Sequence, residues 1–162
     1  GPIWFGKKIL QNFGANLTLS AGSGTPYSQQ ANVTTAQFGI PIQTTLEGSV
    51  NGSRKPWSFR ADLKLNKSFS FALGEIGGNE RKLKMNAYVW VQNLFNTDNI
   101  IAVYDYTGNP DDDGYLSSAE GQQYAAQQID PIAFTDQYNV YVNNPNHYSR
   151  PRTIRIGLTM NF

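Results

Sequence analysis

The chain has 162 residues, of which 40% are hydrophobic and 13% aromatic, and it carries a formal net charge of +1. It contains no cysteine, which excludes a disulfide framework and any thiolate metal site. The 13 basic residues are scattered along the sequence without a basic stripe, which argues against a nucleic-acid-binding surface. No stretch approaches the roughly 18 apolar residues of a transmembrane helix.

Four runs alternate apolar and polar residues with a period of two, the pattern of strands with one apolar and one polar face. They cover about 12–21, 57–73, 83–95 and 153–162. Each reaches the roughly 9–11 residues of a tilted membrane-spanning strand, whereas soluble strands usually have about 5–6. We therefore expect an all-β chain whose strands cross a membrane, with the core strands of a soluble sandwich as the alternative.

The connections between these runs alternate in length. A short connection at 74–82 is flanked by long ones at about 22–56 and 96–152. Outer-membrane barrels have short periplasmic turns and long extracellular loops, and the two kinds alternate in an antiparallel meander. The order predicts that 22–56 and 96–152 are extracellular and that the last strand runs toward the periplasm.

The last strand has the clearest alternation and ends on an aromatic residue. The smallest bacterial barrels have about eight strands, so four strands cannot close one. We therefore expect the chain to be the C-terminal part of a longer protein, with its last strand paired to a barrel strand outside this sequence. The residues expected to face lipid are Ile154, Ile156, Leu158, Met160 and Phe162.

An acidic stretch in the second long loop has the spacing of an EF-hand-type calcium loop, with oxygen ligands at relative positions 1, 3, 5 and 12, glycine at 6 and a backbone carbonyl between. A solvated acidic turn is the alternative, because Asn-Pro and Asp-Gly are turn signals by themselves. A helix is expected over 119–128, capped by Ser117 or Ser118. The candidate ligands of a structural Ca²⁺ are Asn109, Asp111, Asp113, Tyr115 and Glu120.

No residue is predicted to be catalytic, and the chain is not expected to be an enzyme. Ser23 lacks the Gly-x-Ser-x-Gly pattern of a nucleophile elbow. His147 is the only histidine and has no partner cluster for a zinc site, so a hydrogen bond within its loop is the favoured role.

Four segments are typical of one known family: 17–27, QNLFNT at 92–97, GNPDDDGYL at 108–116 and the closing Asn161-Phe162. In these segments the chain resembles the last strands of TonB-dependent outer-membrane receptors, specifically the Oar-like Bacteroidetes type with an N-terminal carboxypeptidase-like regulatory domain. The resemblance implies a plugged barrel of about 22 strands, of which this chain would supply the last four or so. It also implies import of a ligand with energy delivered by TonB.

The partners implied are outer-membrane lipid, the rest of the barrel with its plug, TonB through an N-terminal part not in this sequence, and in some arrangements a surface lipoprotein. The localisation implied is the bacterial outer membrane. A charged ladder is expected on the inward faces, where its charges pair across strands and line a polar lumen in contact with the plug. It consists of Arg60, Asp62, Lys64, Lys84 and Arg155. Two other functions stay open: a structural barrel subunit of a secretion or surface-assembly complex, and a secreted carbohydrate-binding β-sandwich.

Overall fold

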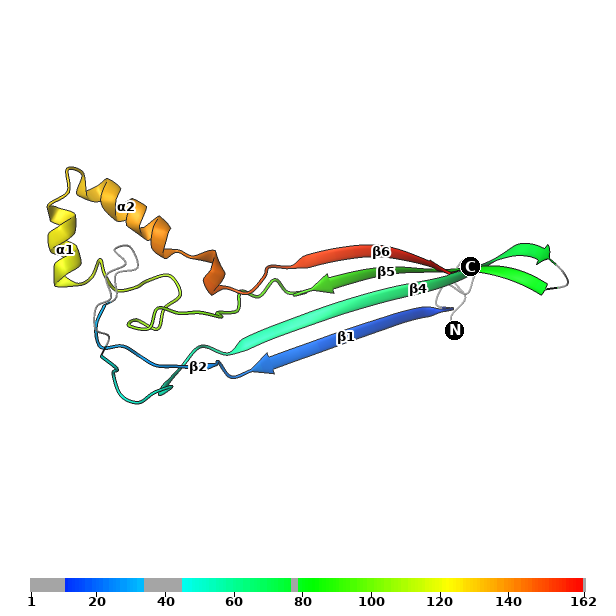
Figure 1. The fold of residues 1–162 in the computed structure, drawn as a ribbon, viewed down its shortest axis with the longest axis horizontal. Coiled ribbons are helices and arrows are strands. Elements are labelled where there is room, and N and C mark those ends of the chain that lie inside the picture. Colours follow the sequence, from blue (N-terminus) through cyan, green and yellow to red (C-terminus); the bar gives the residue numbers. More distant parts are fainter. Residues whose placement is uncertain (1–10, 34–44, 77–78, 162) are drawn as a thin grey trace. The chain divides into compact units, whose positions relative to one another are not determined.

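The computed structural model describes residues 11–33, 45–76 and 79–161 (Figure 1). The chain is predominantly β with antiparallel sheets, as the alternation predicted. It divides into two compact units, which are described in turn. Phe162, one of the residues expected to face lipid, lies outside the described residues.

The first unit contains a four-stranded sheet with the strand order β1-β4-β5-β6. Each strand therefore lies beside the next long strand along the chain, as in a meander. Their lengths are 10, 19, 14 and 9 residues. The strands are β1 (Phe13–Gly22), β4 (Ser58–Ile76), β5 (Asn79–Gln92) and β6 (Thr153–Asn161).

All neighbouring strands of this sheet are antiparallel. The β4/β5 and β5/β6 pairs have this direction in their registers. For β1 and β4, Ser20 donates to the carbonyl of Arg60, while the Asn12 carbonyl accepts from Ser68, so the paired positions run in opposite order. The two long connections, which follow β1 and β5, consequently both leave the sheet at the same end.

The connection between β4 and β5 is shorter than the predicted turn at 74–82. The register of β4 shifts between Ala72 and Gly74, which is a β-bulge. The bulge absorbs one residue, so pairing resumes at Gly74 and Arg81 and continues to Ile76 and Asn79. A glycine that reads as a turn signal thus lies within the strand pairing, as glycines at bulges do.

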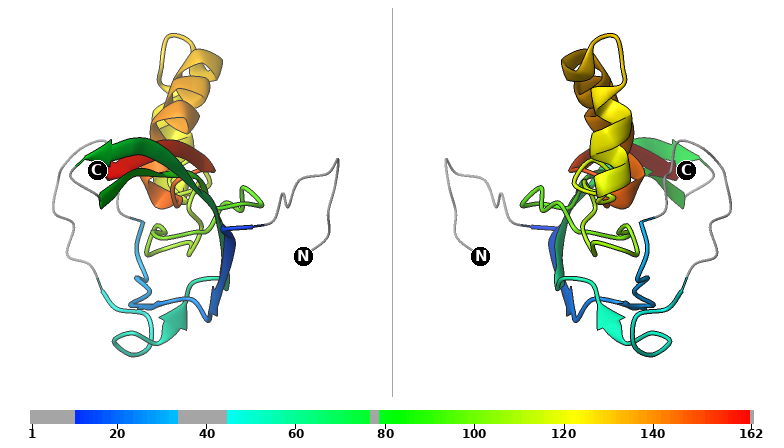
Figure 2. Two further views of the ribbon diagram at one scale, coloured as in Figure 1. Left: turned by 90° about the vertical axis from the view of Figure 1, so that its right-hand side faces the viewer. Right: turned by 90° about the vertical axis from the view of Figure 1, so that its left-hand side faces the viewer.

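The pairing register separates the sheet into a polar and an apolar face. One cross-strand row is Lys64, Trp90 and Arg155, and the next row on the same face holds Tyr88 opposite Gly157. The intervening row, on the opposite face, is apolar and consists of Leu65, Val89 and Ile156. Figure 2, which looks along the strands, shows the sheet as a twisted and curved layer.

Glycine at position 157 lets an aromatic ring cover the backbone of β6. A Cβ atom there would lie 2.4 Å from Cζ of Tyr88, so the ring occupies the space that a side chain would take. Gly14 of β1 similarly lies under the side chain of Asn66. On the polar face, large side chains therefore lie over glycines of the neighbouring strand.

The second unit consists of Ala21–Ser58 and Asp98–Ser149, which are the two long connections. Strands β2 (Pro26–Tyr27) and β3 (Ser53–Arg54) form a small antiparallel sheet. The apolar core of the second unit consists of Tyr115, Tyr138 and Val142, each 2–3% exposed. Tyr138 is the largest fully buried side chain among the described residues.

Two α-helices and one 3₁₀ turn lie in this unit. Helix α1 (Ala119–Ala126) begins at Ser118, whose side chain accepts from the backbone N–H of Gly121, which confirms the predicted start. Helix α2 (Pro131–Val142) was not predicted, although Asp130 caps it and Pro131 occupies its first turn. The 3₁₀ turn η1 spans Pro145–His147. Within the described ranges, no helix is both long and apolar enough to traverse a membrane.

Candidate functional site

The polar ends of β4, β5 and β6 meet around a tight turn at 93–97. Strand β5 ends at Gln92, so the prediction that the strand continues to residue 95 is wrong. The reason is Asn93, whose φ of 54° lies in the left-handed region that ends a strand. Asparagine tolerates this conformation better than most residues. The QNLFNT segment is therefore a strand end followed by a turn.

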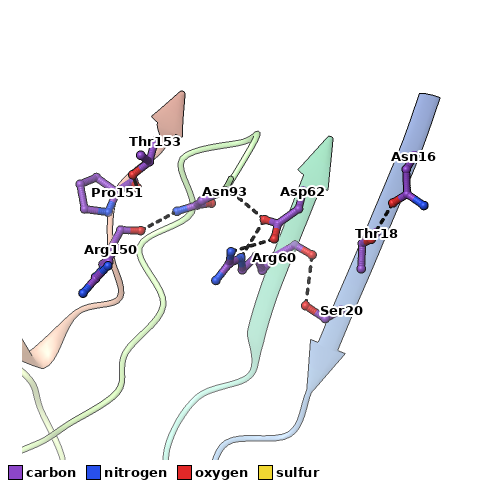
Figure 3. Close-up of polar contacts among 9 residues, drawn as sticks. All are labelled: Asn16, Thr18, Ser20, Arg60, Asp62, Asn93, Arg150, Pro151 and Thr153. Carbon is purple, nitrogen blue, oxygen red and sulfur yellow. Dashed lines mark hydrogen bonds and ion pairs between the residues drawn. The ribbon is translucent and has the colours of Figure 1, made fainter. Parts of the chain in front are cut away.

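Asn93 is 3% exposed, and its side chain makes three hydrogen bonds. Its amide nitrogen donates to the carbonyls of Thr97 (3.0 Å) and Arg150 (3.1 Å). Its amide oxygen accepts from the backbone N–H of Thr97 at 2.9 Å. One buried asparagine thus joins the turn to the segment that leads into β6 (Figure 3).

The same turn is also fixed to β4 and to residue 152. The backbone N–H of Leu94 donates to the carbonyl of Ala61 at 2.7 Å, and the ring of Phe95 stacks on Phe59 at 6.1 Å. Asn96, which also has positive φ, accepts from the backbone N–H of Arg152 at 2.8 Å. These bonds hold three segments that are distant in sequence in one geometry.

Asp62 links the turn to a charged pair on β4. Arg60 donates through Nε and Nη2 to the two carboxylate oxygens of Asp62, both at 2.7 Å. Oδ1 of Asp62 also accepts from the backbone N–H of Asn93 at 2.9 Å. The bidentate fork fixes the Arg60 guanidinium and balances the charge of Asp62 (Figure 3).

The expectation of cross-strand ion pairs is wrong for this cluster. The Arg60–Asp62 bridge lies within β4, two residues apart on one face. Lys64 and Arg155 contact aromatic rings instead of carboxylates: Nζ of Lys64 lies 5.3 Å from the ring centroid of Tyr88, and Cζ of Arg155 lies 5.4 Å from that of Trp90. Cations on the faces of Tyr and Trp are stabilised by the ring quadrupole.

A pocket of about 390 Å³ opens beside this cluster. It is wholly within the first unit. Three arginines line it, together with polar groups from the ends of β5 and β6. The lining residues are Arg60, Gln92, Asn93, Arg150, Pro151, Thr153 and Arg155.

Four of the five residues proposed as calcium ligands have other hydrogen bonds. The side-chain oxygen of Asn109 accepts from the backbone N–H of Asp111, and the carboxylate of Asp111 accepts from the hydroxyl of Tyr148. Asp113, which is 2% exposed, accepts from the backbone N–H of Tyr115 and from the hydroxyl of Tyr138. The Tyr115 carbonyl accepts from the backbone N–H and the hydroxyl of Ser118.

These residues are not drawn together around one point. Glu120 lies in the first turn of α1, where its negative charge stabilises the helix by interacting with the positive end of the helix dipole. In the part of the chain that is described, no three His, Cys, Asp or Glu side chains lie close enough to hold a metal ion. Asp111 and Asp113 do border a pocket of about 240 Å³. Calcium binding by this loop stays a prediction.

The loop tyrosines that contact these aspartates have altered acidity. The hydrogen bond to Asp111 raises the pKa of Tyr148 to about 12. Burial, with the bond to Asp113 next in importance, raises the pKa of Tyr138. His147 donates from Nδ1 to the Pro110 carbonyl at 2.6 Å, so a hydrogen bond within the loop is confirmed for the single histidine.

The four described residues among those predicted to face lipid lie on the apolar face of β6 and are exposed. Ile156 is 80% exposed and Ile154 60%, while Leu158 and Met160 are 51% and 50% exposed. Other large apolar residues of the sheet share this exposure, at 40% or more. They are Phe13, Leu17, Leu19, Phe59, Phe69 and Phe71.

Comparisons with known proteins add no family assignment. No family model matches the chain, and neither the curated proteins nor the solved structures contain a significant match. Function must therefore be argued from the sheet, its two faces and the polar cluster.

Proposed function

We propose that this chain forms part of the barrel wall of a TonB-dependent outer-membrane receptor, which imports a ligand across the bacterial outer membrane. The observation that carries the proposal is the uncovered apolar face of the sheet. Ile154 and Ile156 are 60% and 80% exposed although they lie in a regular strand. Contiguous exposed apolar surface of this kind marks contact with a membrane or another protein.

Strand length supports lipid over a protein partner. Strands β4 and β5 have 19 and 14 residues, and the shortest of the four has 9. Soluble strands are usually about 5–6 residues long, whereas about 9–11 suffice to cross a bilayer at a tilt. The charges of the sheet agree, because Arg60, Asp62 and Lys64 share the face that would line an aqueous interior.

The proposal requires further strands beside this sheet. In the described sheet, β1 and β6 are edge strands, each paired on one side. An open edge is not tolerated in hydrocarbon because its backbone groups find no hydrogen-bond partner there. The rest of the barrel, its plug and TonB are therefore the proposed protein partners.

Two rival functions make different demands. A secreted carbohydrate-binding sandwich would cover the apolar face with a second sheet, and the large apolar exposures argue against it within the described residues. A structural barrel subunit of a secretion or surface-assembly complex would share the wall proposed here. The presence of a plug and a TonB-contacting segment in the parent sequence would favour import over that role.

Reconstitution into liposomes tests the membrane proposal. We expect this chain, together with the further barrel strands that close its edges, to float with the vesicles after alkaline extraction and to need detergent for monodispersity. Ile156→Arg would place a cation on the lipid face at a cost of roughly 2–4 kcal/mol at the bilayer midplane. Thr159→Arg, on the opposite face of the same strand, is the matched control and should insert like the unsubstituted chain.

A monodisperse chain in plain buffer would contradict the proposal. Equal loss of insertion in Ile156→Arg and Thr159→Arg would also contradict it, since only one face is proposed to meet lipid.

A further inference from the structure

Where its side chains are described, the polar face of the sheet carries more positive than negative charge. Arg60, Lys64 and Arg155 lie on it, with Lys84 further along β5. The only carboxylate in the sequence from 58 to 72 is Asp62, and residues 82–92 and 153–161 contain none. Residues that looked scattered in the sequence are thus gathered by the strand register into one cationic surface.

Asp62 offsets the charge of Arg60, and within the described residues the other cations of this surface have no ion pair. Both oxygens of Asp62 accept from Arg60, and one also accepts from the backbone of Asn93. Its side chain is 22% exposed, compared with 47% for Arg60. The pair leaves the remaining Arg60 donors in place at the rim of the pocket.

Two other guanidinium groups at the pocket lack a carboxylate. Within the described residues, neither Arg150 nor Arg155 makes a side-chain hydrogen bond or an ion pair. The position of Arg150 is set through its backbone, since its carbonyl accepts from the buried side chain of Asn93. Arg155 is oriented by the ring of Trp90. Nζ of Lys64 also lies over this ring, 6.0 Å from its centroid.

We propose that the pocket between Arg60, Arg150 and Arg155 binds a small oxyanion, a carboxylate or a phosphate group of a dissolved ligand. Guanidinium groups present planar forks of donors that match carboxylate and phosphate oxygens. Here the Arg60 fork is held by an ion pair and the Arg155 fork by an aromatic ring, while a buried asparagine fixes the backbone of Arg150. The pocket of about 390 Å³ is large enough for such a group with its bound water. This binding does not depend on insertion of the sheet into a membrane.

The test uses the full chain in detergent, with Trp90 as the reporter. The chain has three tryptophans, so Trp4→Phe and Trp57→Phe leave Trp90 alone beside Arg155. Inorganic phosphate and succinate are titrated separately while sodium chloride holds the ionic strength constant. We expect a saturable change in Trp90 emission with at least one of the two probes.

Arginine variants separate a site from a diffuse field. Arg150→Gln, which does not touch Trp90, should weaken the affinity about tenfold, since it removes a charge-assisted contact. Arg152→Gln removes the same charge two residues away, outside the pocket lining, and should change the affinity less than about twofold. Asp62→Asn should tighten binding, because it frees the Arg60 fork from its carboxylate.

Two results would overturn the proposal. One is the absence of saturation with both phosphate and succinate. The other is an equal loss of affinity in Arg150→Gln and Arg152→Gln, which would show that net charge alone attracts the anion. Neither result bears on liposome insertion, so the pocket and the barrel wall can fail separately.

Discussion

Asp62 is predicted to stabilise the strand ends mainly through the backbone of Asn93 and only weakly through Arg60. The Arg60 side chain is 47% exposed, and exposed ion pairs contribute only about 0.2–1 kcal/mol. Asn93 is 3% exposed, and a buried donor left without an acceptor costs about 1–3 kcal/mol. The two contributions can be separated with two substitutions.

Asp62→Asn removes the ion pair but keeps an oxygen that can accept from Asn93, whereas Asp62→Ala removes both interactions. We expect a loss of about 1 kcal/mol or less for Asp62→Asn and roughly 2–3 kcal/mol for Asp62→Ala. About 1.4 kcal/mol corresponds to a factor of ten. The Asn93 amide hydrogen should therefore exchange at least tenfold faster in Asp62→Ala than in the unsubstituted chain.

Hydrogen exchange of the Asn93 amide in the detergent-solubilised full chain is the assay. Thr18→Ala is the matched control, since among the described residues its hydroxyl bonds only to the neighbouring side chain of Asn16 on the same polar face. Equal exchange rates for Asp62→Ala and Asp62→Asn would refute the assignment of the larger contribution to the Asn93 bond.

Three further predictions concern other parts of the chain. Tyr148→Phe should remove a stabilising contribution that is fully present below pH about 10 and lost as the pH rises through about 12, as measured by thermal unfolding across that range. Gly157→Val should displace the Tyr88 ring and lower stability by about 1–3 kcal/mol, visible in the near-ultraviolet circular dichroism; an unchanged spectrum would contradict the packing. Calcium titration should be saturable in the parent and weakened in Glu120→Gln, and equal affinity in both would count against the calcium loop.

The strands could be predicted because alternation is a local property. Each of the four long strands lies on a run with a period of two, and the antiparallel order follows from their succession along the chain. The bounds were less accurate where one residue overrides the pattern. The bulge between Ala72 and Gly74 continues β4 past a turn signal. The positive φ of Asn93 ends β5 at Gln92, before the predicted bound.

The polar cluster was only partly predictable, because its partners come from distant segments. Arg60, Asp62 and Arg155 were recognised as charges on one face, but their actual partners depend on side-chain geometry that alternation does not encode. Arg150 was not singled out, since nothing local distinguishes it from Arg152; its proximity to Arg60 depends on the Asn93 turn. Helix α2 did have a local signal, because Asp130-Pro131 places an N-cap residue before a proline in the first turn.

The central claim is that one face of β6 meets lipid and the other meets water. Because the chain has no cysteine, single cysteines can be placed at successive positions from Thr153 to Asn161 and labelled with a polarity-sensitive fluorophore in the closed barrel reconstituted in liposomes. The account predicts an emission pattern with a period of two, blue-shifted at 154, 156, 158 and 160 and red-shifted between them. Uniform emission along the strand, or a pattern with the two faces reversed, would contradict it.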